Sequence, residues 1–121
     1  MIISSLGHTW IIDLDGTIVK HNGYLIDGED SFLEGAKEFL MAIPEKDMIV
    51  FVTSRTDNYK EMTINFLDKN RVRYDHVIFN APYGERILVN DDKPSGLVMG
   101  YVFNKIRNEK LEIEVIEDPN L

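Results

Sequence analysis

Three short apolar runs, each ending at a polar cluster, constrain most strongly what this chain can fold into. Residues 9–12 and 86–89 are each followed by acidic residues, and residues 47–52 are followed by a Thr-Ser-Arg sequence. The run at 47–52 is almost entirely apolar, as in a strand that a parallel sheet buries on both faces. Helical patterns lie between the runs, so the sequence predicts βαβ units with right-handed crossovers.

The connecting segments complete this pattern. Helices are expected over 30–42, with Pro44 ending the first, and over 57–70, with a further short strand at 75–79. The Asn22-Gly23 pair is typical of hairpins and indicates a small flap over 18–28. Residues 97–106 fit a helix or a strand, and 111–115 alternate like a half-exposed strand. For residues 100–121 we therefore expect a hairpin, a pair of short strands or a tail.

Composition limits the class of protein. The 121 residues, 44% of them apolar, fit one domain over 1–121 with a real core. The absence of cysteine excludes disulfides, thiolate zinc sites and cysteine nucleophiles. The net charge of −8 argues against a broad nucleic-acid interface. No membrane span or secretory signal is recognisable, and we expect a cytoplasmic α/β protein: a single Rossmann-like, three-layer domain with a mainly parallel central sheet.

The polar clusters are expected to converge, because ligands of open parallel sheets bind at the carboxyl ends of the strands. Four carboxylates would meet there, and they would repel one another without a cation. Oxygen ligands without cysteine or histidine favour Mg²⁺. The four acidic residues are Asp13, Asp15, Asp91 and Asp92.

In this order, the motifs resemble those of the haloacid dehalogenase (HAD) superfamily. The sequence Asp13-Leu14-Asp15-Gly16-Thr17 follows the first apolar run, Thr53 follows the second, and Asp91-Asp92 follows the run at 86–89, so the resemblance covers about residues 9–96. It implies a magnesium-dependent phosphatase in which the carboxylate of Asp13 attacks phosphorus and forms an aspartyl-phosphate. Asp15 would act first as general acid and then as base.

The resemblance also implies the other roles at the site. The hydroxyl of Thr53 and the amide of Ser54 would bind phosphoryl oxygens, while Asp91 and Asp92 would complete the magnesium site with Asp13 and the Asp15 carbonyl. The residues assigned to phosphate or substrate binding are Gly16, Thr53, Ser54, Arg55 and Arg86, although Arg55 could equally pair with an acidic neighbour.

The family also has a Lys or Arg before the fourth strand, which balances the charges of nucleophile and phosphate. Arg86 stands at the right place in sequence order, and Lys93 follows the acidic pair. We favour Lys93 as the catalytic cation, because it would share a strand end with Asp91.

No large insertion separates the motifs, so the usual cap domain is absent or reduced to the flap. An open site suits a bulky substrate or a lid from a neighbouring subunit in an oligomer. The expected substrate is a small-molecule phosphate ester, such as a sugar phosphate. Two alternatives remain: a binding or regulatory module of the same fold without turnover, and a nucleic-acid end phosphatase, against which the acidic charge argues.

Overall fold

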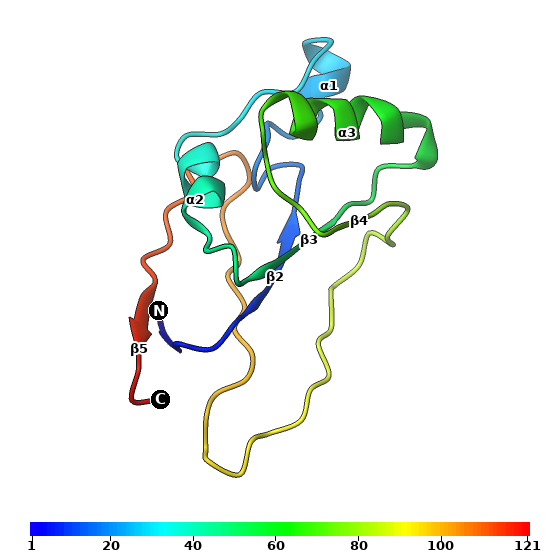
Figure 1. The fold of residues 1–121 in the computed structure, drawn as a ribbon. Helices are drawn as coiled ribbons and strands as arrows, with labels where there is room; N and C mark the ends of the chain where they lie inside the picture. Colours follow the sequence, from blue (N-terminus) through cyan, green and yellow to red (C-terminus); the bar gives the residue numbers. More distant parts are fainter.

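The computed structural model describes residues 1–121 as an α/β fold in which all paired strands are parallel (Figure 1). One sheet has three strands in the order β2-β3-β4, and the other pairs β1 with β5. The strands are β1 (Ile2–Ser4), β2 (Thr9–Asp13), β3 (Met48–Val52), β4 (His76–Ile78) and β5 (Ile116–Asp118). The helices are α1 (Gly23–Ile26), α2 (Ala36–Ala42) and α3 (Lys60–Lys69), with a 3-10 turn (Asp57–Tyr59) directly before α3.

The register of the larger sheet sets the position of the site. Asp13 is paired with Val52, and Val52 with Ile78, so all three strands end at the same edge. The residues that follow β2 and β3 are therefore neighbours in space although some forty positions apart in sequence. This part of the sequence prediction is confirmed.

The core lies on one face of this sheet. Ile49 and Phe51 of β3 have no exposed surface, and Ile12 of β2 is buried beside them. Helix α2 contributes Leu40 and α3 contributes Leu67, as their apolar spacing predicts. The alternate residues of the strands are more exposed; Ile11, for example, keeps 56% of its surface exposed. The carboxylate of Asp13 shares this more open face, because alternate residues of a strand point the same way.

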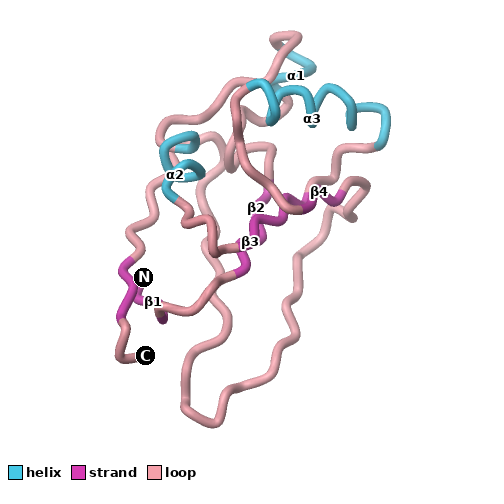
Figure 2. Tube along the Cα trace, in the orientation of Figure 1, coloured by secondary structure: helices cyan, strands magenta, loops and turns pink.

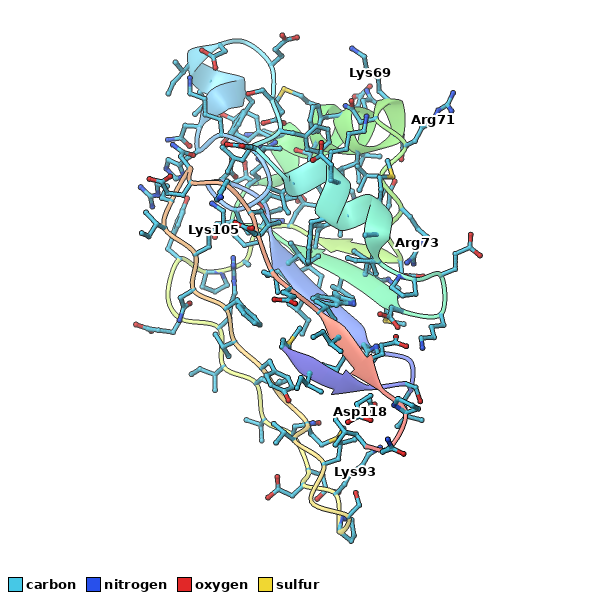
Figure 3. All side chains as sticks on the ribbon, turned by 90° about the vertical axis from the view of Figure 1, so that its left-hand side faces the viewer. Lys69, Arg71, Arg73, Lys93, Lys105 and Asp118 are labelled. Atoms are coloured by element: carbon cyan, nitrogen blue, oxygen red, sulfur yellow. The ribbon has the colours of Figure 1, made fainter.

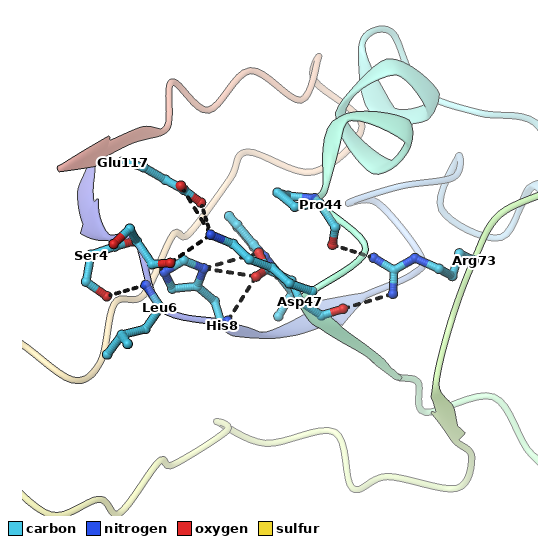
Figure 4. Close-up of polar contacts among 10 residues, drawn as sticks. Ser4, Leu6, His8, Pro44, Asp47, Arg73 and Glu117 are labelled. Atoms are coloured by element: carbon cyan, nitrogen blue, oxygen red, sulfur yellow. Dashed lines mark hydrogen bonds and ion pairs between the residues drawn. The ribbon is translucent and has the colours of Figure 1, made fainter. Parts of the chain in front are cut away.

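A buried aspartate ties the start of β2 to the start of β3 (Figure 4). Asp47 accepts hydrogen bonds from the indole Nε1 of Trp10 at 2.9 Å and from the backbone N–H of His8 at 3.0 Å, and its Oδ1 lies 3.1 Å from Nδ1 of His8. Burial alone would raise the pKa of Asp47, but the hydrogen bonds from Trp10 and His8 outweigh it and lower the pKa. Nearby, Lys46 pairs with Glu117 of β5 at 3.0 Å and so links the two sheets.

The local structure differs from the expected pattern at three places. No strand forms at 86–89, because the chain between Ile78 and Ile116 forms no helix or strand and runs as a long loop (Figures 1 and 2). The flap holds the helical turn α1 instead of a hairpin. The C-terminal strand is 116–118 and not 101–104 or 111–115. A segment forms β-structure only where a partner strand lies beside it, and these segments have none. Strand β5 forms because β1 lies next to it.

Helix α2 begins later than the sequence predicts. Gly35 precedes it with φ of 79°, in the left-handed region, so the helix cannot extend back to residue 30. No helix in the structure is long and apolar enough to cross a bilayer, since the longest, α3, has ten residues.

We predict that Gly35→Ala destabilises the fold by several kcal/mol. A Cβ at this position would meet the backbone carbonyl of Leu111, and φ is also left-handed. The conformational strain costs roughly 1–2 kcal/mol and the clash roughly 1–3 kcal/mol more. Gly28→Ala is the matched control, because its φ is also 79° but nothing lies within 4 Å. Urea unfolding of both variants measures the difference in their free energies of unfolding. Equal losses of stability would show that the backbone at Leu111 does not pack on Gly35.

Candidate active site

Asp13 stands at the end of β2, at the start of a tight turn. The backbone N–H groups of Thr17, Ile18 and Val19 all donate to the carbonyl of Leu14 at 2.9–3.1 Å. Gly16 has φ of 81°, which a residue with a side chain rarely adopts. The Thr17 hydroxyl donates to Oδ2 of Asp13 at 3.0 Å and holds the carboxylate in place. About a third of the Asp13 side chain (34%) stays exposed, so a substrate can reach it.

The cation beside Asp13 is Arg86. Its Nη1 donates to Oδ1 of Asp13 at 2.9 Å, from the long loop after β4. The preference for Lys93 is therefore corrected. It assumed a strand at 86–89 that would carry Lys93 to the sheet edge, and that strand is absent.

Asp91, Asp92 and Lys93 lie together in the long loop, away from Asp13. They border a hollow of about 470 Å³ formed by residues 88–100. Figure 3 shows Lys93 at the opposite end of the molecule from Lys69 and Arg71 of the α3 region, whereas Lys105 lies much nearer that region. The structure thus brings together the first two sequence clusters and leaves the third apart.

Arg55 is the most completely bonded side chain at the site. It is 4% exposed, and all five of its N–H groups have an acceptor. Two go to the two oxygens of Asp15 at 3.0 and 2.9 Å, and two go to the oxygens of Asp30 at 2.9 and 2.7 Å. The fifth goes to the hydroxyl of Thr63 in α3 at 2.9 Å, and that hydroxyl donates to the carbonyl of Tyr59 at 2.7 Å.

Of the two roles considered for Arg55, these bonds agree with pairing to an acidic neighbour. Burial would lower its pKa, but the hydrogen bonds to Asp30 and Asp15 outweigh this and raise it, so the guanidinium stays charged. The ring of Tyr24 lies over it, with Cζ 4.0 Å from the ring centroid. Burial and the charge of Asp15 raise the pKa of this tyrosine. Because no N–H of Arg55 is free, the geometry makes it a positioning residue for Asp15 instead of a substrate ligand.

Thr53 and Ser54 connect the strand end to the next segment. The Thr53 hydroxyl is buried and accepts the backbone N–H of Arg55 at 3.1 Å, which shapes the turn after β3. The Ser54 hydroxyl contacts the carbonyl of Pro82 at 3.4 Å. Their assignment to phosphate binding stays a prediction.

Two of the four carboxylates predicted to bind magnesium, those of Asp13 and Asp15, lie at the end of β2 and in the turn that follows it. Each carboxylate oxygen of Asp13 and Asp15 already accepts a hydrogen bond, from Arg86, Thr17 or Arg55. No group of three acidic or histidine side chains is placed to hold a metal. The metal role of Asp91 and Asp92 rests on the sequence pattern alone.

Sequence reasoning missed four residues around the turn. Asp30, at the expected start of the first helix, is the second acid paired with Arg55. Lys105 and Asn108, both from the C-terminal part of the chain, donate hydrogen bonds to the carbonyl of Gly16 at 3.0 and 2.9 Å. His21 lies beside this turn with its Nδ1 buried and without a hydrogen-bond partner. Nothing local in the sequence marks Lys105 or Asn108, because their contacts span about ninety positions.

Comparison with known proteins gives one structural likeness. A chain of the Pnkp1/Rnl/Hen1 complex superposes with a TM-score of 0.53 and 27% sequence identity, over 69% of the present chain. The match spans 31% of that chain, so it concerns a part of a larger protein. No family model and no curated protein matches the sequence.

We predict that Arg55→Gln lowers the free energy of unfolding by about 3–5 kcal/mol, because it leaves the buried carboxylate of Asp30 without its partner. Arg86→Gln is the matched control. In the ion pair with Asp13, the Arg86 side chain is 41% exposed and the Asp13 side chain 34%. Loss of this pair therefore lowers the free energy of unfolding by less than about 1 kcal/mol. Denaturant unfolding of both variants measures the difference. Similar losses would show that Arg55 does not hold the fold together.

Proposed function

We propose that this chain hydrolyses phosphate monoesters, with the carboxylate of Asp13 as the nucleophile on phosphorus. The observation that carries the proposal is the setting of Asp13: a partly exposed carboxylate at the carboxyl end of a parallel strand, oriented by Thr17 and paired with Arg86. Ligands bind at this edge in open parallel sheets. The likeness to a chain of the Pnkp1/Rnl/Hen1 complex supports phosphoryl-transfer chemistry.

The two hydrogen-bond partners of Asp13 would serve different purposes. A phosphate dianion approaching a bare carboxylate is repelled, and the guanidinium of Arg86 offsets that repulsion with planar N–H donors suited to phosphoryl oxygens. Thr17 holds the other carboxylate oxygen, so the attacking atom is fixed before the substrate arrives. In the first step, the Asp13–phosphorus bond forms as the bond to the leaving oxygen breaks.

Asp15 would complete the cycle. Both of its oxygens accept hydrogen bonds from Arg55, which orients its carboxylate beside the turn. In the second step it would take a proton from the water that attacks the aspartyl-phosphate, which frees phosphate and restores Asp13. In the first step it would give a proton to the leaving oxygen, for which its carboxyl must turn from Arg55 toward the substrate.

Two substrate classes follow from two different observations. The acidic net charge of −8 favours a small metabolite such as a sugar phosphate over a nucleic acid. The structural likeness favours a phosphorylated nucleic-acid end, as the second candidate. The neighbour belongs to an assembly of several proteins, so we also propose that a partner or a second subunit covers the site.

Asp13→Asn should abolish hydrolysis of an aryl phosphate, with a loss on the order of a thousandfold or more, because an amide cannot form the acyl-phosphate. Asp27→Asn is the control, since Asp27 pairs with Lys20 on the surface and not with the site. Steady-state phosphate release measures both, with circular dichroism confirming that both variants fold. Turnover that survives in Asp13→Asn would exclude this nucleophile, and absence of turnover in the parent protein across a broad ester panel would favour a binding module.

A magnesium requirement is the second part of the proposal, drawn from the four-carboxylate sequence pattern. Removal of divalent ions with a chelator should stop phosphate release, and added Mg²⁺ should restore it. Asp91→Asn should raise the Mg²⁺ concentration needed for half-maximal activity, whereas Asp27→Asn should not. Activity that persists in the chelator would rule out the metal, and an unchanged Mg²⁺ dependence in Asp91→Asn would rule out its assignment as a ligand.

A further inference from the structure

A short segment from the C-terminal part of the chain, residues 105–108, lies across the turn that follows Asp13; we call it the strap. Lys105 Nζ and the Asn108 backbone N–H both donate to the carbonyl of Gly16, at 3.0 and 2.9 Å. The backbone N–H of His21 donates to Oδ1 of Asn108 at 2.7 Å. The strap is thus held by hydrogen bonds to Gly16 and His21, and the side chains of Lys105 and Arg107 lie beside the turn that follows Asp13.

Arg107 has no polar partner within the chain. It is exposed and makes no hydrogen bond or ion pair in the structure, while its aliphatic stem packs on Gly16. A Cβ on Gly16 would approach Cγ of Arg107 to 2.9 Å, so the glycine also makes room for this side chain. The guanidinium therefore keeps all its donors for a ligand.

Lys105 is partly buried and bonds to carbonyl oxygens only, those of Gly16 and Ile106. No carboxylate lies within ion-pair distance of its ammonium group; Glu109 is the acid whose charge acts on it. Burial lowers the pKa of Lys105, and the charge of Glu109 opposes that shift. An ammonium without a carboxylate partner in a chain of net charge −8 is a favourable place for an anion.

Arg86 adds a third cation with unused donors. One of its N–H groups reaches Asp13, and no other hydrogen bond from it is formed. The other arginines near charged groups are committed: Arg55 uses all five donors, and Arg73 binds the carbonyls of Pro44 and Asp47. Free donors therefore gather around the Asp13 turn.

We propose that Lys105 and Arg107 of the strap, together with Arg86, bind a second phosphate group of the substrate next to the one that Asp13 attacks. This inference rests on the proposed function and specifies its substrate class. Arg86 and Arg55 are the cations paired with Asp13, Asp15 and Asp30, whereas Lys105 and Arg107 form no ion pair, so their charged groups stay open to a phosphate. A second phosphate of a small bisphosphate and the phosphodiester beside a nucleic-acid end carry the same chemistry.

The test compares kcat/KM for three esters: an aryl phosphate with one phosphate, a nucleoside 3′,5′-bisphosphate, and a dinucleotide bearing a terminal 3′-phosphate. The parent protein should prefer a two-phosphate substrate over the aryl phosphate, and Arg107→Gln should reduce that preference about tenfold, mainly through KM. Lys105→Gln should act in the same direction. Arg71→Gln is the matched control, because Arg71 is also exposed and makes no side-chain hydrogen bond. It should leave the preference unchanged.

The two small substrates distinguish the sources of the second phosphate. Preference for the bisphosphate indicates a metabolite, and preference for the dinucleotide indicates a nucleic-acid end. A preference that is absent in the parent protein, or that Arg107→Gln leaves intact, would overturn the proposal.

A binding measurement separates this proposal from the proposed function. Calorimetry with Asp13→Asn and the nucleoside bisphosphate should show binding that weakens about tenfold when Arg107→Gln is added. If no ester is hydrolysed but this Arg107-dependent binding is present, the phosphatase proposal fails and the second-phosphate site stands. If binding is absent or independent of Arg107, the second-phosphate site is wrong whatever the catalytic result.

Discussion

The guanidinium of Arg55 joins four segments that are otherwise separate in the sequence. Arg55 follows the end of β3. Its guanidinium binds Asp15 in the turn after β2, Asp30 before α2 and Thr63 in α3. A buried charge is tolerated only when it is paired and hydrogen-bonded, and here every donor is used. This one side chain therefore sets the orientation of Asp15, the path of the chain toward α2 and the position of α3 on the sheet.

The same residue explains why the two acids of the turn differ in character. Asp15 faces the protein and is held by a buried cation, while Asp13 faces solvent and is held by the exposed Arg86 and the hydroxyl of Thr17. A carboxylate that is fixed but accessible would suit the nucleophile proposed above, and a carboxylate held from the protein side would suit the proposed proton transfer. The two environments therefore match the different roles that we propose for two identical groups.

At the opposite end of the strands, the hydrogen bonds of Asp47 with His8 and Trp10 have a similar structural role. They fix the start of β2 against the start of β3, and Lys46 next to Asp47 connects to Glu117 of the second sheet. With Asp47 at one end and Arg55 at the other, buried polar contacts set the relative position of the two strands. The apolar core between the two ends, centred on Phe51, is held by contacts without a preferred direction, so it leaves that position to the polar groups.

The sequence by itself determined the three strands of the main sheet, the helices between them, and the meeting of Asp13 with the segment after Val52. These features depend on local periodicity and on parallel pairing, which a linear pattern records. Only the tertiary structure decided that Arg86 and not Lys93 pairs with Asp13, that Arg55 holds Asp15, and that residues 105–108 cross the turn. Hydrogen-bond partners far apart in sequence depend on where long loops come to lie, and no local pattern encodes that.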